Sequence, residues 1–327
     1  MVVEESALVS LLRLVDRMPL PPLPGGRGRP YVYGEPVILK ALVVMLLRRL
    51  PTVHTLLDVL AEPTDERQHV RALLRDAQGR FPSRRTWERR LAALTDRLPL
   101  LIRSLGAFLL GLLQPWPRGG RAVAIDATPV RARGGVWHKK HREAGVVPHT
   151  SIDTEAAWTK SGWHGWVYGW LLHLVITVSD TVWLPLAAEA TPANVADNVQ
   201  APTLLAGLPA AAHVILGDQH YNDPALHALC AADDRILITT KRGRYPHTDD
   251  GVAVRRIFHQ LRSHSIENFN AQFKAIFGCL GSVPTRGAMA TRRFLLGAVL
   301  LYQLTLWHHH EVGRSLRVGL KSFLLAA

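Results

Sequence analysis

Cysteine is scarce in this sequence, which has only two cysteines, Cys230 and Cys279, in 327 residues. Two thiols are too few for a disulfide framework or for a thiolate metal site, so we expect a reducing compartment. Histidine is plentiful, but two groups of it lack the spacing of a Cys/His zinc finger or a His-Glu-x-x-His helix: His138, His141 and His149, and the run from His308 to His310. The sequence therefore gives no support for a zinc protein.

Long apolar runs are also missing. The longest, Leu105 to Leu113 and Phe294 to Leu301, are shorter than the roughly 18 to 20 residues that cross a bilayer. The first apolar stretch follows Glu4 and Glu5, whereas a signal peptide begins with basic residues. We therefore expect a cytosolic protein that neither enters a membrane nor is exported. The sequence has no internal repeat and no low-complexity segment.

Acidic residues are outnumbered: 26 Asp and Glu stand against 39 Lys and Arg, which gives a formal charge of +13 and a pI of about 10.4. The excess is spread along the chain and is mostly arginine, whose planar guanidinium binds phosphate in a bidentate manner. A biased genome is an alternative reason for the arginine. The charge predicts an anionic partner, with nucleic acid or an acidic membrane surface as the leading classes.

The first third of the chain has helical patterns near residues 5–18, 36–50, 53–61 and 66–76. Ser83 is placed to cap a further helix, and this helix carries four arginines: Arg84, Arg85, Arg89 and Arg90. Short helices that end in a basic one are typical of helix-turn-helix DNA readers, although an ordinary solvated face has the same composition. Pro and Gly cluster at 114–120, so we predict a helical DNA-binding region over 1–118 and a second domain over 119–327.

The pattern changes to strands after this boundary. Three predicted strands come first, followed by helices and strands in alternation and then two helices. Pro185 places the third strand at a sheet edge. The strands are expected at 122–126, 170–178, 183–190, 213–218 and 235–240, and the helices at 194–208, 222–232, 259–278 and 287–311. This is the element order of an RNase H-like fold.

Three carboxylates lie at the ends of predicted strands or in the helix that follows them. Asp126 ends the first predicted strand, Asp218 ends the fourth, and Glu267 lies in the helix after the fifth. Strand ends and an adjacent helix can converge at one end of a sheet. Three carboxylates with open water positions suit Mg²⁺, and two such ions about 3.5–4 Å apart can activate an attacking oxygen and stabilise a leaving one. Each Asp taken alone is more often a turn or cap residue.

At these residues the sequence resembles the DDE transposases of bacterial insertion sequences. The resemblance covers about 120–280 and rests on AIDATPV around Asp126, YGWLLHLVITV, ILGDQHYND around Asp218, and IENFNAQFK around Glu267. It implies an α/β, RNase H-like mixed sheet with flanking helices, preceded by an all-α DNA-binding region. It further implies that Asp126, Asp218 and Glu267 are the catalytic residues and hold two Mg²⁺ (or Mn²⁺) ions.

One branch of that family has the helix pattern Tyr-x2-Arg-x3-Glu-x6-Lys. Lys274 matches its lysine, but Gln260 and Ser263 stand in place of Tyr and Arg, and Arg262 lies one position early as a candidate substitute. Glu267 and Lys274 are about two helical turns apart and project from nearly the same face. We expect Glu267 to reach the metals and Lys274 and Arg262 to meet DNA. The alternative for Lys274 is the solvated edge of an amphipathic helix.

Basic and aromatic loops supply further candidates for DNA contact. The stretch between the first two strands contains Lys139 and Lys140 among other basic residues, and a basic turn occupies 241–246. The aromatic side chains of Trp163, His164 and Trp166 can stack on an extruded base. Solvated loops and buried aromatic residues are the alternatives.

The resemblance implies a transposase that binds double-stranded transposon ends and target DNA. Water cleaves a phosphodiester to leave a 3′-OH, which then attacks the target, without a covalent protein intermediate. We expect a homodimer, because two ends must be synapsed, at the nucleoid in the bacterial cytoplasm. Two alternatives remain: an RNase H-like endonuclease or resolvase without strand transfer, and a catalytically inactive DNA-binding relative.

Overall fold

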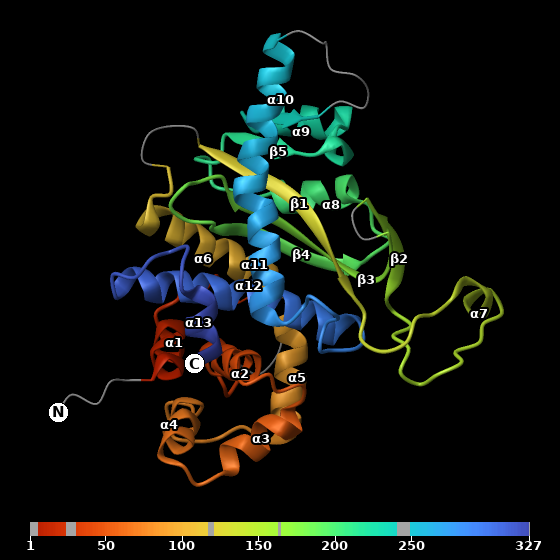
Figure 1. The fold of residues 1–327 in the computed structure, drawn as a ribbon. Coiled ribbons are helices and arrows are strands. Elements are labelled where there is room, and N and C mark those ends of the chain that lie inside the picture. Colours follow the sequence, from red (N-terminus) through yellow and green to blue (C-terminus); the bar gives the residue numbers. More distant parts are fainter. Residues whose placement is uncertain (1–5, 24–30, 117–120, 163–164, 241–248, 327) are drawn as a thin grey trace. The chain divides into compact units, whose positions relative to one another are not determined.

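The computed structural model describes residues 6–23, 31–116, 121–162, 165–240 and 249–326. The chain forms two compact units: one combines residues 1–105 with 293–327, and the other is Gly106–Arg292. Figure 1 draws both, with α6 (Leu98–Leu113) and α12 (Ala288–Glu311) running from one unit into the other. This division differs from the predicted boundary at 118/119. The predicted basic turn at 241–246, Trp163 and His164 lie outside the described residues.

The first unit is helical, as the sequence predicts. Its core forms around α2, where nearly every side chain from Val37 to Met45 is buried. Ser83 caps α5, as expected, by accepting a hydrogen bond from the Thr86 amide. Besides parts of α6 and α12, its helices are α1 (Ala7–Asp16), α2 (Glu35–Leu47), α3 (Val53–Ala61), α4 (Asp65–Leu73), α5 (Arg84–Thr95) and α13 (Leu320–Ala326).

The C-terminal helices belong to the first unit because their apolar side chains complete its core. Gln303 donates a buried 2.9 Å hydrogen bond to the Ile102 carbonyl. At Gly297 a Cβ atom would lie 3.0 Å from the side chain of Leu42, so α12 and α2 approach closely. The sequence assigned these helices to the second domain, because an apolar helix pattern does not say which core the helix enters.

The second unit is built on a six-stranded mixed sheet in the order β2-β3-β1-β5-β6, with β4 pairing β3. β3 is antiparallel to β1, β2 and β4, whereas β5 is parallel to β1 and β6. This is an RNase H-like arrangement, as predicted. The strands are β1 (Ala122–Arg131), β2 (Ala157–Ser161), β3 (Gly165–Thr177), β4 (Pro185–Pro192), β5 (Val214–Gly217) and β6 (Ile236–Thr239).

β1 and β2 differ most from the sequence-based expectation, and β3 begins at Gly165, five residues earlier than expected. β1 continues five residues beyond Asp126, because it stays paired with β3 as far as Arg131. The pairing of β1 with β5 ends at Ala124, so Pro129 has no β5 neighbour. A proline is tolerated there because its missing N–H can face the side of β1 that has no paired strand. β2 was not predicted, since five residues of mixed polarity give a weak pattern. β4 begins with Pro185 and pairs only with β3 among the described strands, which confirms its edge position.

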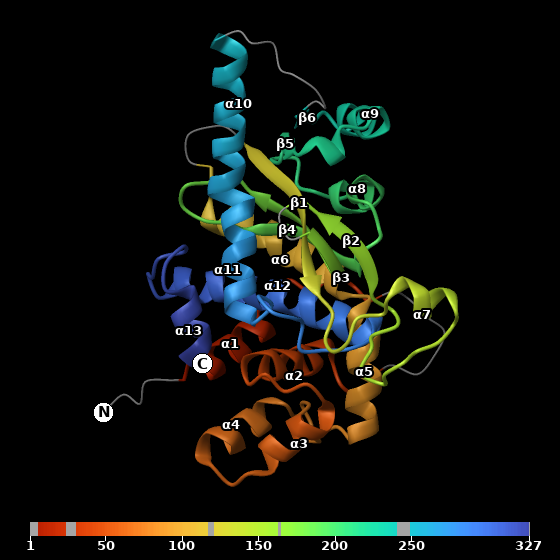
Figure 2. The same ribbon diagram turned by 45° about the vertical axis from the view of Figure 1, so that its right-hand side comes forward.

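Helices flank both faces of the sheet. A long helix, α10 (Asp249–Arg262) continued by α11 (Asn268–Phe277), crosses one face of the sheet, while α8 (Asp197–Leu205) and α9 (Pro224–Ala232) lie on the other face (Figures 1 and 2). A short helix, α7 (Lys139–Glu143), lies between β1 and β2 in the chain. None of the helices in the described ranges is both long and apolar enough to cross a lipid bilayer.

Candidate active site

The direction of the strands brings two predicted carboxylates together. Ala124 of β1 pairs with Leu216 of the parallel strand β5, and two residues further this register brings Asp126 level with Asp218. β5 ends at Gly217 while β1 continues. The two aspartates therefore lie just past the point where hydrogen bonding between these strands ends. Neighbouring strands are about 4.8 Å apart. The sheet thus presents the two carboxylates side by side at the carboxyl end of β5.

Asp126 is held by the long helix that crosses the sheet. The Arg262 guanidinium donates to one carboxylate oxygen at 3.2 Å, and the Asn270 amide donates to the other at 3.1 Å. Only 19% of the Asp126 side chain is exposed. Burial raises the pKa of Asp126 to about 7; the Arg262 charge opposes this shift, whereas the charges of Asp218 and Asp197 add to it. The site therefore favours a cation beside Asp126.

Asp218 begins a tight 3-10 turn (Gln219–Tyr221) by accepting a 2.8 Å hydrogen bond from the His220 amide. The turn places the Tyr221 ring against Gly217, where a Cβ atom would lie only 2.9 Å from Tyr221 Cβ. Tyr221 is completely buried, and its hydroxyl has no hydrogen-bond partner. Burial and the charges of Asp197, Asp126 and Asp218 raise the Tyr221 pKa well above its ordinary value. A buried hydroxyl therefore lies among three carboxylates.

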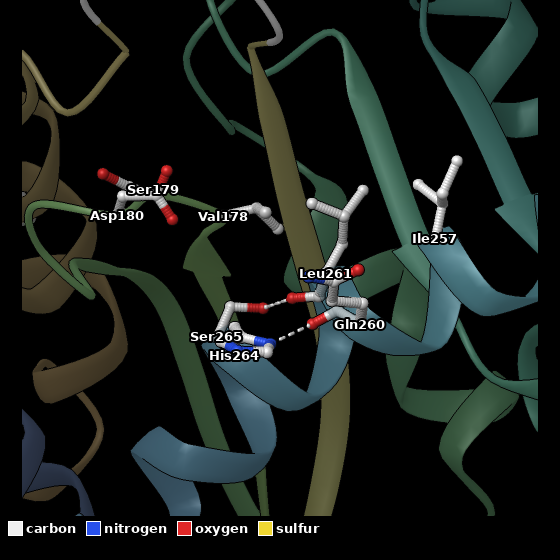
Figure 3. A pocket seen from close by; sticks show the side chains of 8 residues that line it. All are labelled: Val178, Ser179, Asp180, Ile257, Gln260, Leu261, His264 and Ser265. Carbon is white, nitrogen blue, oxygen red and sulfur yellow. Dashed lines mark hydrogen bonds between the residues drawn. The ribbon is translucent and has the colours of Figure 1, made fainter.

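A π-helical turn (Ser263–Glu267) interrupts the long helix, and the Asn268 amide donates to the Ser263 carbonyl five residues back. Side chains satisfy carbonyls of the preceding turn: Ser265 Oγ donates to Leu261 at 2.6 Å and His264 Nδ1 to Gln260 at 2.8 Å (Figure 3). Residues five apart align in such a turn, as residues four apart do in an α-helix. The position of Arg262 relative to Glu267 is therefore similar to that of an arginine at position 263 in a regular α-helix.

The structure does not bring Glu267 into contact with the two aspartates. Glu267 is exposed at the end of the π-helical turn, and the described contacts include no hydrogen bond or ion pair from it to Asp126 or Asp218. Asn270, one turn later, contacts Asp126 instead. Across the described ranges, no three His, Cys, Asp or Glu side chains lie close enough together to hold a metal ion. The expected three-carboxylate cluster is therefore only partly assembled.

Lys274 lies one turn beyond Asn270 and is half-buried. Burial lowers the pKa of Lys274, while the charges of Cys279 and Asp126 oppose that shift. Arg262 and Asn270 lie eight residues apart across the π-helical turn and both contact Asp126. Lys274 follows Asn270 by four residues, on the same face of the helix. This face carries two basic groups whose charges interact with Asp126, those of Arg262 and Lys274.

Sequence reasoning missed Asp197, the first residue of α8. Its carboxylate lies 3.8 Å from Nδ1 of the buried His173. Burial and the charge of Asp218 raise the pKa of Asp197 to about 6. The only signal in the sequence is an acidic residue in the first turn of a helix, where acidic residues are common for dipole reasons alone.

The four arginines predicted to bind DNA on α5 are not equivalent. Arg84 pairs with Glu88 at 2.8 Å, while Arg85 and Arg89 are exposed one turn apart. Arg90 is buried, with its guanidinium 3.6 Å from the centre of the Tyr31 ring. Burial lowers the Arg90 pKa, and its side chain packs inside the unit. Arg85 and Arg89 are therefore the members best placed for phosphate.

On α7 of the second unit, Lys139 and Lys140 are exposed, and Lys139 lies 3.6 Å from Glu143. A cavity of about 280 Å³ in the same unit is lined by Arg131, Trp158, Tyr168 and the exposed Trp166, among others. A second cavity, of about 270 Å³, lies between the β3–β4 turn and α10 (Figure 3); none of Asp126, Asp197, Asp218 or Glu267 lines it.

Comparison with known proteins adds one finding. A protein-family model described as "Transposase DDE domain" matches residues 117–304, which include β1, β5, Asp197 and the whole of the long helix. No match was found among curated proteins or among solved structures.

Proposed function

Because the chain belongs to the family of transposases with a DDE domain, we propose that it mobilises a bacterial insertion sequence. In this proposal it binds the transposon ends as double-stranded DNA and catalyses Mg²⁺-dependent phosphodiester cleavage and strand transfer. A homodimer synapses the two ends, and the protein acts at the nucleoid in the bacterial cytoplasm. The proposal places DNA binding in the helical first unit and catalysis in the second.

The observation that carries the proposal is the placement of Asp126 beside Asp218 within the matched residues. Both supply oxygen ligands, which Mg²⁺ prefers. The pKa of Asp126 is raised by burial first and by the charges of Asp218 and Asp197 second, and a bound cation would oppose both effects. Glu267 lies only three residues, about 4.5 Å along the helix axis, from Asn270, which touches Asp126. In this proposal Asp126 and Asp218 would hold a divalent metal with Glu267 as the third carboxylate, although Glu267 does not contact the two aspartates in this structure.

The protein's part in the reaction is positioning and charge neutralisation. Two bound Mg²⁺ or Mn²⁺ ions would supply activation of the attacking oxygen and stabilisation of the leaving oxygen. Arg262 orients the Asp126 carboxylate and opposes the rise of its pKa, and Lys274 meets a DNA phosphate farther along the same helix face. On α7, Lys139 and Lys140 contact the flanking DNA or the target.

Purified protein tests this function directly. The substrates are linear duplexes that carry the DNA from each side of the reading frame, with a supercoiled plasmid as the target and Mg²⁺ in the buffer. We expect new 3′-OH ends and joined products. Cleavage without joining would favour the endonuclease or resolvase, and binding without cleavage would favour the inactive relative. Inverted repeats bracketed by short direct duplications in the flanking DNA would further favour transposition.

Neutralising Arg85 and Arg89 together by substitution with Gln should weaken end binding and flatten its salt dependence. Each true phosphate contact contributes a slope of about −0.9 to log K against log salt, so loss of both should reduce the slope by about 1.8. Fluorescence anisotropy at several salt concentrations measures this. Arg84→Gln is the matched control, since Glu88 already neutralises Arg84. An unchanged slope in the double variant would remove α5 from the DNA interface.

Lys274→Gln should lower end affinity and strand transfer but leave Mn²⁺ binding unchanged, because the lysine would contact phosphate and carries no metal ligand. Filter binding, a joining assay and Mn²⁺ titration give the three values. Lys321→Gln, an exposed lysine of the first unit, is the control for loss of one positive charge. Wild-type DNA affinity and joining in Lys274→Gln would make the lysine a bystander.

A further inference from the structure

We infer that Arg262 couples DNA binding to cation binding at the proposed site. In the free chain Arg262 pairs with Asp126 and keeps a divalent cation out; when DNA binds, Arg262 moves to a phosphate and leaves Asp126 to the cation. The inference rests on the proposed function, because it names the regulation of the same site. Across the described ranges no three His, Cys, Asp or Glu side chains are placed to hold a metal ion, and the inference identifies this arrangement as the DNA-free form.

Both oxygens of the Asp126 carboxylate are occupied by groups of the long helix. Arg262 donates to Oδ1 at 3.2 Å and Asn270 donates to Oδ2 at 3.1 Å. A carboxylate binds Mg²⁺ through these same oxygens, and a guanidinium beside them repels a second positive charge. Of the charges that act on the Asp126 pKa, that of Arg262 has the largest effect, and it lowers the pKa. A divalent cation therefore competes with Arg262 for Asp126.

The contact between Arg262 and Asp126 is weaker in form than a structural ion pair of the same unit. Arg292 binds Glu189 with two hydrogen bonds, at 2.8 and 3.0 Å, and such bidentate pairs are the strong ones. Arg262 donates a single hydrogen bond to Asp126 among the described contacts, although only 7% of its side chain is exposed. The Arg262 pair therefore lacks the geometry of a permanent clamp.

Two atoms at this contact are unsatisfied. Arg262 Nε and Asn270 Oδ1 are buried and have no hydrogen-bond partner, whereas buried polar atoms are rarely left unpaired. The planar guanidinium has donors to spare for a second anion, and phosphate matches its geometry. Lys274, one turn beyond Asn270 on the same face, is the residue that the proposed function assigns to a phosphate. A phosphate near this face would therefore offer Arg262 a better partner than Asp126 does.

The π-helical turn that follows Arg262 gives this movement a place. The turn runs from Ser263 to Glu267, so it ends at the proposed third carboxylate. Ser265 Oγ donates to the Leu261 carbonyl at 2.6 Å and supports the backbone of the preceding turn. A cavity of about 270 Å³ is lined by Leu261 and Ser265 among others (Figure 3), so the turn has open space on one side. Because Arg262 and Glu267 flank this one turn, a movement of Arg262 shifts the backbone that carries Glu267.

The first experiment measures Mn²⁺ binding by electron paramagnetic resonance on the full chain without DNA, at mildly alkaline pH. We expect Arg262→Gln to bind Mn²⁺ about 10-fold more tightly than the wild type, the usual size of a coupling between two sites. Arg256→Gln is the matched control: Arg256 is an exposed arginine of the same helix and is absent from the charges that act on the Asp126 pKa. Circular dichroism verifies that both variants are folded. Equal or weaker Mn²⁺ affinity in Arg262→Gln overturns the inference.

A second measurement uses the unmodified chain, so it does not depend on the folding of a variant. Hydrogen exchange followed by mass spectrometry compares the chain with and without saturating Mn²⁺. We expect faster exchange of the backbone amides at 262–268 when Mn²⁺ is bound, because the contact between Arg262 and Asp126 is then broken. Amides at 297–307, in α12, serve as the internal control. Unchanged exchange at 262–268 would contradict the displacement of Arg262.

The third measurement tests the coupling itself. If DNA raises the affinity for Mn²⁺, then Mn²⁺ must raise the affinity for DNA by the same factor. Fluorescence anisotropy of a labelled end duplex, at constant ionic strength with and without Mn²⁺, gives this factor. We expect it to be about 10 in the wild type and in Arg256→Gln, and close to 1 in Arg262→Gln. The same factor in all three proteins would overturn the role of Arg262.

These measurements fail independently of the proposed function. If Arg262→Gln binds Mn²⁺ more tightly but the wild-type chain never joins DNA ends, the coupling holds and the transposase proposal is lost. If the wild-type chain joins DNA ends and Arg262→Gln binds Mn²⁺ like the wild type, the function holds and the coupling is lost.

Discussion

Asp126→Asn should abolish DNA cleavage, reducing the rate by about 10³-fold or more, which corresponds to about 4 kcal/mol of transition-state stabilisation. Asparagine keeps the shape of the side chain and can still accept from Arg262, but it removes the charge that neutralises the metal. Asp126 contacts two side chains of the long helix and lies level with Asp218, so the proposed metal site depends on it directly. Single-turnover cleavage of end DNA with saturating Mg²⁺ measures the effect.

The variant must be separated from a folding defect, because Arg262 is only 7% exposed and loses its ionic partner. Removing one member of a buried ion pair can be strongly destabilising. Thermal unfolding and end-DNA affinity are therefore measured on the same preparation, and we expect both to show a folded protein that binds DNA. Asp223→Asn is the charge control, because Asp223 caps α9, is absent from the charges that act on the pKa of Asp126, and can be replaced by Asn as a cap. Cleavage at the wild-type rate by the purified Asp126→Asn variant would contradict the assignment of Asp126 to the active site.

Gly169→Ala should destabilise the second unit by about 3 kcal/mol. A Cβ atom at position 169 would lie 2.0 Å from the Val130 carbonyl oxygen and 2.8 Å from the Ala132 amide, so two backbones would have to separate. Gly169 pairs with Arg131 in the same β1–β3 ladder that holds Asp126. Urea unfolding monitored by tryptophan fluorescence measures the loss, and we expect cleavage activity to fall with it.

Gly111→Ala is the matched control in α6. A Cβ atom there meets nothing within 4 Å, and the residue lies inside a helix. Alanine is favoured over glycine in helix interiors by roughly 0.5–1 kcal/mol, so this variant should be slightly more stable than the wild type. Equal stability of Gly169→Ala and the wild type would contradict the close β1–β3 approach.

The sequence predicted those parts of the site that depend on local pattern. Asp126 and Asp218 could be found because each follows a short apolar segment with the pattern of a buried strand. Parallel strands bring the residues at their carboxyl ends to the same edge of a sheet. The sequence predicts DNA contact for Arg262, and in the structure its guanidinium pairs with Asp126. Arg262 lies one residue before the position of the arginine in the family pattern. A π-helical turn stabilised by Ser265 and its neighbours explains this offset, and residue spacing alone does not predict such a turn.

Other features depend on tertiary packing that no local pattern contains. The charge of Asp197 raises the pKa of Asp126, and the position of Asp197 depends on the pairing of β4, the strand before α8, with β3. Arg90 resembles Arg85 and Arg89 in the sequence, yet Tyr31 covers it. The strand β2 and the outward position of Glu267 depend likewise on neighbours distant in the chain.

The division of the first unit between the two ends of the chain has a consequence for synthesis on the ribosome. Helix α2 emerges early, but α12 emerges only after the whole of Gly106–Arg292 has been made. The nascent chain therefore carries uncovered apolar helices during most of translation, a state that favours aggregation and chaperone binding. A message truncated before α12 would yield a sheet unit able to pair its strands, attached to N-terminal helices that lack their core partner.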